Sequence, residues 1–442
     1  MDRDDSCAFF LNLPPFRCVI FRLNPPTLFF HNMIRHFFSL IFSAVAVIAM
    51  AAVPEYPFND CCGSLIPYPD RKNLAEWPDT LRPVFINHVG RHGARYPAGS
   101  THTLTLLDML REAESLGSLT PTGQKLLKIT EDVARLSKGR WGALDSLGMA
   151  EQAGIADRMY RSFPSVFKSG AVSALSSDSP RCMMSMFSFV HQLDKRCTGT
   201  EIATLTGTVT SPLMRPFDVD SAYLDFRHRN LWEPAYDRYM ERTVPLTALH
   251  RAVGDKFPFR DEAHARDMAL MEYYVLAGLS AMSYQADLSE FFTLDEINRL
   301  WSCFNLRQYL QRTATSVSTV PADIARPLVR NLVETTDRYV SGDTAVTVCL
   351  RFGHAETLMP LLSLLRIPGC YYVTDDFSTV SGHWRDFYVV PLASNIRFTL
   401  FKASSGEYYL RTDLNEEPVT LIPGDPRLYL PWSEARLYML SL

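Results

Sequence analysis

The sequence contains little cysteine, nine in 442 residues, and this density excludes a small fold held together by disulfides. Its 21 glycines and 28 prolines are too few for a collagen or a low-complexity chain. It also lacks an excess of positive charge, because 44 Lys and Arg are balanced by 48 Asp and Glu. The resulting net charge of −4 argues against binding nucleic acid or a membrane surface through bulk charge. Any polyanionic ligand must therefore be held by locally concentrated cations.

An apolar run without charge, 37–53, lies near the amino terminus. It follows Arg35 and ends in small alanines, which is typical of a secretory signal peptide. An uncleaved anchor helix is the alternative, although the run is shorter than the roughly 20 residues that a spanning helix needs. The prolines in the first 32 residues are unusual for a signal, which favours Met33 as the true start. We expect a leader over 1–52, no stable membrane anchor, and a secreted protein or one in an ER- or lysosome-like lumen.

Removal of this leader takes two cysteines with it and leaves seven, an odd number. A secreted chain permits disulfides, and an odd count leaves one thiol free or paired outside the chain. The sequence does not indicate which cysteines pair. It has no Asn-x-Ser/Thr sequon, so N-glycosylation is not expected.

The rest of the chain alternates strand and helix patterns at both ends and is helical in the middle. The expected strands are 81–89, 171–175, 345–352, 386–390, 396–401, 408–411 and 419–422. The expected helices are 103–137 with a break at 120–123, 147–160, one opening at 181, 263–281, 294–313 and 355–365. This order predicts an α/β fold with a mostly parallel sheet flanked by helices, formed by 53–200 and 341–442. Residues 201–340 are predicted to form an inserted, mainly α-helical domain.

A basic string, Arg91-His92-Gly93-Ala94-Arg95-Tyr96-Pro97, directly follows the first expected strand. Ligands of open α/β sheets bind at the carboxyl ends of strands. Arginine offers a planar fork of donors suited to phosphate. His92 can act as a nucleophile if a backbone carbonyl holds one ring nitrogen and the other keeps its lone pair. Solvated or capping groups at a strand end are the alternative, but the length of the string favours a functional site.

Two further motifs also follow expected strands. Arg181 opens a helix, whose amino terminus favours phosphate, although an exposed first-turn arginine is the alternative. His354 and Glu356 open the helix after 345–352. His354 can donate to a phosphate oxygen, and Glu356 can serve as a general acid if its pKa is high enough to hold a proton. The alternatives are a capping or core histidine and a favourable charge in the first helical turn.

Together, the 91–97 string, Arg181 and the His354-Ala355-Glu356 triplet resemble the histidine acid phosphatase family. The resemblance is strongest to its multiple inositol polyphosphate phosphatase branch, which carries His-Ala-Glu where most members carry His-Asp. It extends from about residue 55 to the end, with thin similarity over 200–340. It implies the α/β fold with a helical insert described above. Many relatives have a larger residue in place of Gly90, and we expect this glycine to loosen the loop that follows.

The resemblance implies a role for each motif residue. His92 is the nucleophile and forms a phosphohistidine, and Glu356 protonates the leaving alkoxide and then acts as the base for water. The remaining residues hold the phosphate: Arg91, Arg95, Arg181 and His354. No metal or other cofactor is implied, because these cations surround the phosphate without one.

The implied substrate is a small phosphorylated molecule, an inositol polyphosphate such as phytate, and no nucleic acid. The other phosphates of such a substrate need further cations. Four residues are candidates, although a solvated position on the surface is favoured for each: Arg140, Arg227, Arg229 and Lys256. A broad-specificity acid phosphatase or a bisphosphoglycerate phosphatase is the second hypothesis. The third is a polyanion-binding protein without turnover, which the presence of both His92 and Glu356 disfavours.

Overall fold

The computed structural model describes residues 55–442, which belong to one compact unit, Val53–Leu442. The leader predicted over 1–52 and the start predicted at Met33 lie outside the described residues. In the described part, no helix is both long and apolar enough to cross a membrane.

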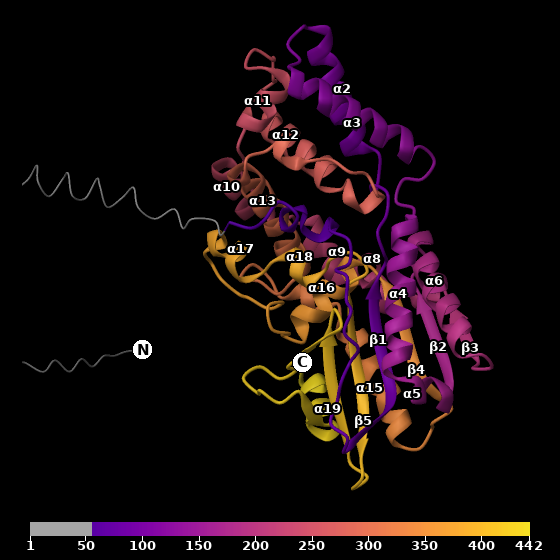
Figure 1. Ribbon diagram of the computed structural model, residues 1–442. Coiled ribbons are helices and arrows are strands. Elements are labelled where there is room, and N and C mark those ends of the chain that lie inside the picture. The colour runs from indigo at the N-terminus through magenta and orange to yellow at the C-terminus, as the bar shows by residue number, and fades with distance from the viewer. Residues whose placement is uncertain (1–54) are drawn as a thin grey trace, which may run out of the picture. The chain divides into compact units, whose positions relative to one another are not determined.

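An eight-stranded sheet forms the centre of this unit, with the order β3-β2-β4-β1-β5-β6-β7 and with β8 paired to β6 (Figure 1). Its strands are β1 (Leu81–Arg91), β2 (Ala171–Ser176), β3 (Ile202–Leu205), β4 (Val346–Gly353), β5 (Asn395–Ala403), β6 (Tyr408–Leu414), β7 (Glu417–Val419) and β8 (Tyr429–Pro431). The four strands β3, β2, β4 and β1 are parallel, whereas β5 to β8 pair antiparallel. The predicted α/β class is confirmed, and the motifs lie in the parallel half of a mixed sheet.

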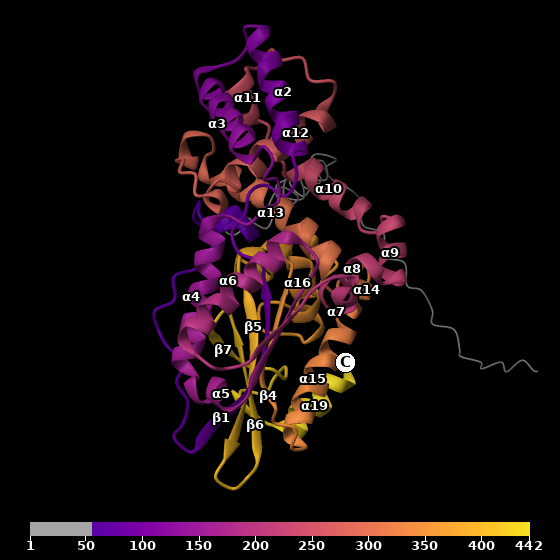
Figure 2. The ribbon, with the colours of Figure 1, turned by 90° about the vertical axis from the view of Figure 1, so that its right-hand side faces the viewer.

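Helices cover both faces of the sheet, as Figure 2 shows with the strands between them. One face carries α4 (Ser146–Ser162), α5 (Pro164–Ser169) and α6 (Pro180–Arg196). The other face carries α15 (Arg326–Val340), α16 (Ala355–Leu364) and α19 (Trp432–Ser441). Because both faces are covered, β1 is buried from Pro83 to its end and reads as a nearly continuous apolar run.

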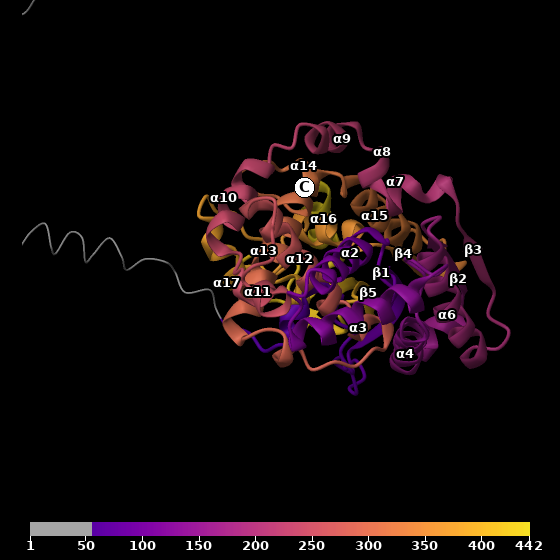
Figure 3. The ribbon, with the colours of Figure 1, turned by 90° about the horizontal axis from the view of Figure 1, so that it is seen from above.

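A group of helices lies beyond the carboxyl end of β1, and Figure 3 shows it from above. Its members are α2 (Thr101–Ser115), α3 (Pro121–Ser137), α10 (Glu233–Thr243), α11 (Thr247–Val253), α12 (Glu262–Ala277) and α13 (Leu294–Arg312). Helices α2 and α3 pack against α12 and α11 around one apolar core. The predicted helical segment 201–340 is therefore joined by two helices from 101–137, and its boundaries stay a prediction.

The helices begin where local chemistry favours it. The side chain of Thr120 accepts a hydrogen bond from Gly123 N at 3.1 Å, with Pro121 in the first turn of α3. Thr293 and Glu296 form a reciprocal capping box at the start of α13. The remaining short helices are α7 (Ser211–Met214), α8 (Pro216–Val219), α9 (Ser221–His228), α14 (Val320–Asp323), α17 (Val380–His383) and α18 (Asp386–Val389).

The prediction of a strand over 386–390 is wrong, because this segment forms α18. Tertiary contacts determine it: the buried Asp386 carboxylate accepts hydrogen bonds from Ser64 N at 2.7 Å and from Trp301 Nε1 at 2.9 Å. The strand expected over 419–422 is displaced to Glu417–Val419, and β3 has no counterpart among the expected strands. The seven cysteines of the described residues form no disulfide, and all except Cys349 are buried.

Candidate active site

The register of the parallel strands brings the three motifs together. In β1 and β4, Arg91 is opposite Gly353, and in β2 and β4, Ser176 is opposite Phe352. The residues that follow each strand, among them His92 and His354, therefore emerge at the same edge of the sheet. The rings of these two histidines lie 5.8 Å apart between centroids.

One nitrogen of the His92 ring is held by backbone. The Nδ1 atom lies 2.9 Å from the carbonyl oxygen of Gly93, and because a carbonyl only accepts, Nδ1 carries the proton. The Nε2 atom consequently keeps its lone pair. Burial, followed by the charges of Arg91, Arg95 and Arg181, holds the pKa of His92 well below its ordinary value. The imidazole is therefore neutral, as a nucleophile requires.

The loop that carries His92 is fixed by α4 and α6. Gly93 N donates to Ser185 Oγ at 3.1 Å, and Ala94 N donates to the carboxylate of Glu151 at 2.7 Å. A Cβ on Gly93 would lie 2.4 Å from the carbonyl oxygen of Gly148, so the close approach of loop and helix requires glycine.

Gly90 does not loosen this loop, contrary to the expectation from the sequence. It lies within β1, opposite Phe352 of β4 and Asn395 of β5. A Cβ at this position would lie 2.8 Å from Nε2 of the buried His88. The absence of a side chain therefore makes room for the His88 ring.

Arginines surround the His92 ring. Arg91 donates through Nη1 to the carbonyl oxygens of Ser64 at 2.7 Å and of Val390 at 2.5 Å. Burial and the neighbouring Arg95 lower the Arg91 pKa to about 10, so the guanidinium stays charged at neutral pH. Arg181, in the first turn of α6, donates to His354 Nδ1 at 3.2 Å. Among the described residues, several buried Nε atoms have no hydrogen-bond partner, and these include the ones of Arg91, Arg95, Arg181 and Arg312.

The contacts of His354 determine its tautomer. Since Arg181 donates to Nδ1, the proton is on Nε2, which lies 3.0 Å from Ser177 Oγ. Burial lowers the His354 pKa to about 3; Glu356 opposes this shift, and the nearby arginines contribute to it. A neutral His354 donates through Nε2–H to Ser177 Oγ, and its ring lies beside that of His92.

Glu356 lies among positive charges that favour its ionised form. It lies in the first turn of α16, and its Oε1 is 3.6 Å from Arg312 Nη2. Burial alone would raise the pKa of this carboxyl, but the positive charges around it, chiefly that of Arg312 and also that of Arg91, outweigh burial and lower the pKa to about 2. A general acid needs a pKa high enough to hold a proton, as the sequence analysis required of Glu356. Without an anionic ligand, Glu356 does not meet this requirement.

Two arginines near the site were missed from the sequence. Arg215, between α7 and α8, has its Nη1 3.4 Å from His354 Nε2 and is paired with Asp218. Arg312 ends α13 and contacts Glu356. The signal available for Arg215 was its place directly before a proline that opens a helix. The cations named instead are all exposed: Arg140, Arg227, Arg229 and Lys256.

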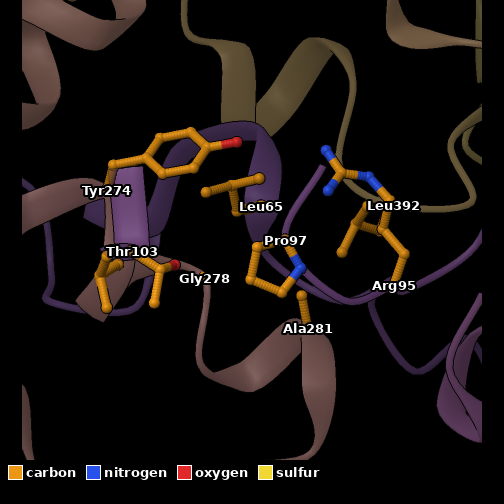
Figure 4. A pocket seen from close by; sticks show the side chains of 9 residues that line it. Leu65, Arg95, Pro97, Thr103, Tyr274, Gly278, Ala281 and Leu392 are labelled. Atoms are coloured by element: carbon orange, nitrogen blue, oxygen red, sulfur yellow. The ribbon is translucent and has the colours of Figure 1, made fainter. Parts of the chain in front are cut away.

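A small pocket, lined mostly by apolar side chains, lies next to the site (Figure 4). Arg95 and Tyr274 are on opposite sides of it, with Leu65 and Pro97 between them. The charge of Arg95 also lowers the pKa of three neighbours, His92, Arg91 and Arg181. Arg95 therefore belongs both to the pocket and to the cation cluster formed by Arg91, Arg95 and Arg181 around His92.

A neutral histidine with a free Nε2, enclosed by arginines at the carboxyl ends of parallel strands, is suited to bind and attack a tetrahedral anion such as phosphate. Fold and site together resemble those of a histidine acid phosphatase.

Comparisons with known proteins give the same class, although no family model matches the chain. The chain is 24% identical to multiple inositol polyphosphate phosphatase 1 of Homo sapiens over 392 residues, 78% of each protein. It is 23% identical to the protein of that name from Gallus gallus over 366 residues, 77% of this chain and 78% of the relative.

Solved structures share the fold. A multiple inositol polyphosphate phosphatase of Bifidobacterium longum, in complex with inositol hexasulfate, superposes with a TM-score of 0.73 at 16% identity, covering 86% of this chain and 97% of that chain. The phytase from D. castellii gives 0.63 at 14% identity, covering 87% and 85%. The resemblance to the histidine acid phosphatase family and its multiple inositol polyphosphate phosphatase branch is thereby confirmed.

Proposed function

We propose that this protein is a phosphomonoesterase that hydrolyses inositol polyphosphates such as phytate through a phosphohistidine on His92. The observation that carries the proposal is the neutral His92 ring, fixed at Nδ1 by Gly93 O and surrounded by arginines. The curated relatives, which are named as inositol polyphosphate phosphatases, support the substrate class.

In the first step, the lone pair of His92 Nε2 attacks phosphorus and the phosphorus–oxygen bond to the leaving group breaks. The leaving oxygen takes that bonding pair and a proton from Glu356. The phosphate oxygens are held by Arg91, Arg95, Arg181 and His354, whose donors balance the charge of the transition state.

Glu356 obtains its proton with the substrate bound. A phosphate dianion at the cation cluster offsets the positive charges that keep this carboxyl ionised, and it raises the carboxyl pKa by direct repulsion. In the second step, water attacks the phosphohistidine, the phosphorus–nitrogen bond breaks, and the Glu356 carboxylate takes the proton of the water. Inorganic phosphate leaves and the free enzyme returns.

The decisive experiment is acid quench with phosphate-labelled phytate. We expect label on the wild-type protein at His92 and none on His92→Ala, which should also lose turnover. Binding of phytate without label or turnover would establish a polyanion-binding protein instead. Equal specificity constants for phytate and an aryl monophosphate would establish a broad acid phosphatase.

We also propose that the chain enters the secretory pathway through a leader over 1–52. The apolar run at 37–53 supports this. Amino-terminal sequencing of the protein from the medium and from the luminal fraction should give a start near residue 52. A mature chain that keeps the apolar run would contradict cleavage.

A further inference from the structure

Arg312 joins the helical part of the molecule to the proton donor proposed for catalysis. It is the last residue of α13, and its side chain is 12% exposed. Its Nη1 donates to the hydroxyl of Tyr223, a buried residue of α9, and its Nη2 lies 3.6 Å from Glu356 Oε1. Its buried Nε has no hydrogen-bond partner among residues 55–442. Tyr223 therefore fixes the position of the guanidinium, while donor capacity remains.

The contact between Arg312 and Glu356 is of a kind that a ligand can replace. At 3.6 Å the two groups form an ion pair without a hydrogen bond. The carboxylate holds only a loose partner, and a phosphate dianion offers the same guanidinium a higher charge and bidentate geometry. A phosphate that reaches this position would therefore take Arg312 from Glu356.

We propose that Arg312 is a specificity-determining residue that favours substrates with a second phosphate next to the one being hydrolysed. The second phosphate binds Arg312, and this frees Glu356 to take up a proton and donate it to the leaving oxygen. With a simple monophosphate, only the phosphate under attack raises the carboxyl pKa, and Arg312 beside Glu356 still favours the ionised form, so protonation of a poor leaving group is slower. The inference rests on the proposed function and deepens it by assigning the preference for polyphosphates to one contact.

Arg215, the other arginine from the helical part, does not fit this role. Its side chain is committed to Asp218, with Nε to Oδ2 at 2.7 Å, and lies over the ring of Phe217 at 5.4 Å. It approaches His354 and not the Glu356 carboxylate. In the described residues, the anionic group within ion-pair distance of Arg312 is Glu356.

The test compares three substrates: phytate, an alkyl monophosphate with a poor leaving group, and an aryl monophosphate with a good one. Arg312→Gln should lower kcat/KM for phytate at least tenfold, leave the aryl monophosphate nearly unchanged, and leave or raise the rate for the alkyl monophosphate. The alkyl reaction should also persist to higher pH, since Glu356 has lost the charge that keeps it ionised. Arg312→Lys, which keeps the charge, should retain most of the discrimination.

Arg436→Gln is the matched control, because Arg436 is an exposed arginine of α19 in an ion pair with Asp337. It should keep the wild-type ratio of phytate to alkyl monophosphate. A uniform loss on all three substrates in Arg312→Gln, or an unchanged ratio with an unchanged pH profile, would overturn the inference. Failure of the proposed function is distinguishable, because then the wild-type protein itself would neither turn over phytate nor carry label on His92.

Discussion

The protonation of Glu356 decides which substrates the proposed reaction can use. We predict that Glu356→Gln lowers kcat for alkyl phosphates by roughly 10²–10⁴-fold, the usual contribution of a general acid. An aryl phosphate, whose leaving group needs no proton, should lose much less. Single-turnover rates for the two substrate classes measure this directly. An equal loss for both would argue that Glu356 acts only by shaping the site.

The neutral state of His92 has a spectroscopic signature. Because burial and the surrounding arginines lower its pKa well below the ordinary value, the ring should stay neutral and protonated at Nδ1 in mildly acidic solution. We predict that a ¹H–¹⁵N spectrum optimised for histidine shows the shifts of a neutral Nδ1–H tautomer for His92 down to pH 5. Assignment through the spectrum of His92→Ala identifies the signal. A titration centred near pH 6.5 would contradict the structure.

The contact between α4 and the loop that carries His92 depends on glycine. A Cβ on Gly148 would lie 2.2 Å from the carbonyl oxygen of Ala94, so α4 cannot keep its position against an alanine. We predict that Gly148→Ala lowers kcat/KM strongly and destabilises the protein by about 1–3 kcal/mol, as overpacking does. Thermal unfolding and steady-state kinetics measure both effects.

Gly154 of the same helix provides the control. A Cβ there would meet the end of the Arg158 side chain, at 3.2 Å, and no backbone of another element within 4 Å. Gly154→Ala should therefore leave the kinetics intact and, because alanine favours helices, leave stability equal or higher. Similar kinetic losses in both variants would refute a specific role for the contact at Gly148.

Glu272 makes the stability of the whole protein depend on pH. It is 1% exposed, its carboxyl oxygens have no hydrogen-bond partner among the described residues, and its neighbour Arg251 is bound to Glu296 at 2.9 Å. Burial, opposed by Arg251 and reinforced by Glu296, raises its pKa to about 8. Since the unfolded chain releases this proton near pH 4.3, the folded state binds more protons between these values, and stability falls as pH rises.

We predict that Glu272→Gln removes this dependence. The free energy of unfolding of the variant should improve relative to wild type by about 1 kcal/mol per pH unit between pH 5 and 7.5. Denaturant unfolding of both proteins across this range gives the difference, in which titrations common to both cancel. Parallel stability curves would show that Glu272 is already ionised in the folded protein.

The sequence predicted the parts of the fold and site that are local. The strands before His92 and His354 could be predicted because buried parallel strands are continuous apolar runs. The candidate site residues follow these strands directly, so they could be predicted as well. Arg215 and Arg312 were not readable, because their place beside His354 and Glu356 depends on how the helical part packs. The helix α18 was missed for the same reason, since remote residues satisfy Asp386.

The position of β4 has a consequence for how the chain is made. It pairs with both β1 and β2 and so separates the first two long strands of the sheet. On the ribosome, β1 and β2 emerge well before Val346. The short strand β3, which follows β2, can pair with it early, but β1 has no partner strand until β4 and β5 are made. The sheet can close only in one late, long-range step, and such steps are slow and leave apolar strand edges exposed meanwhile. The residues that follow β1, β2 and β4 therefore come together only when β4 inserts between the other two strands.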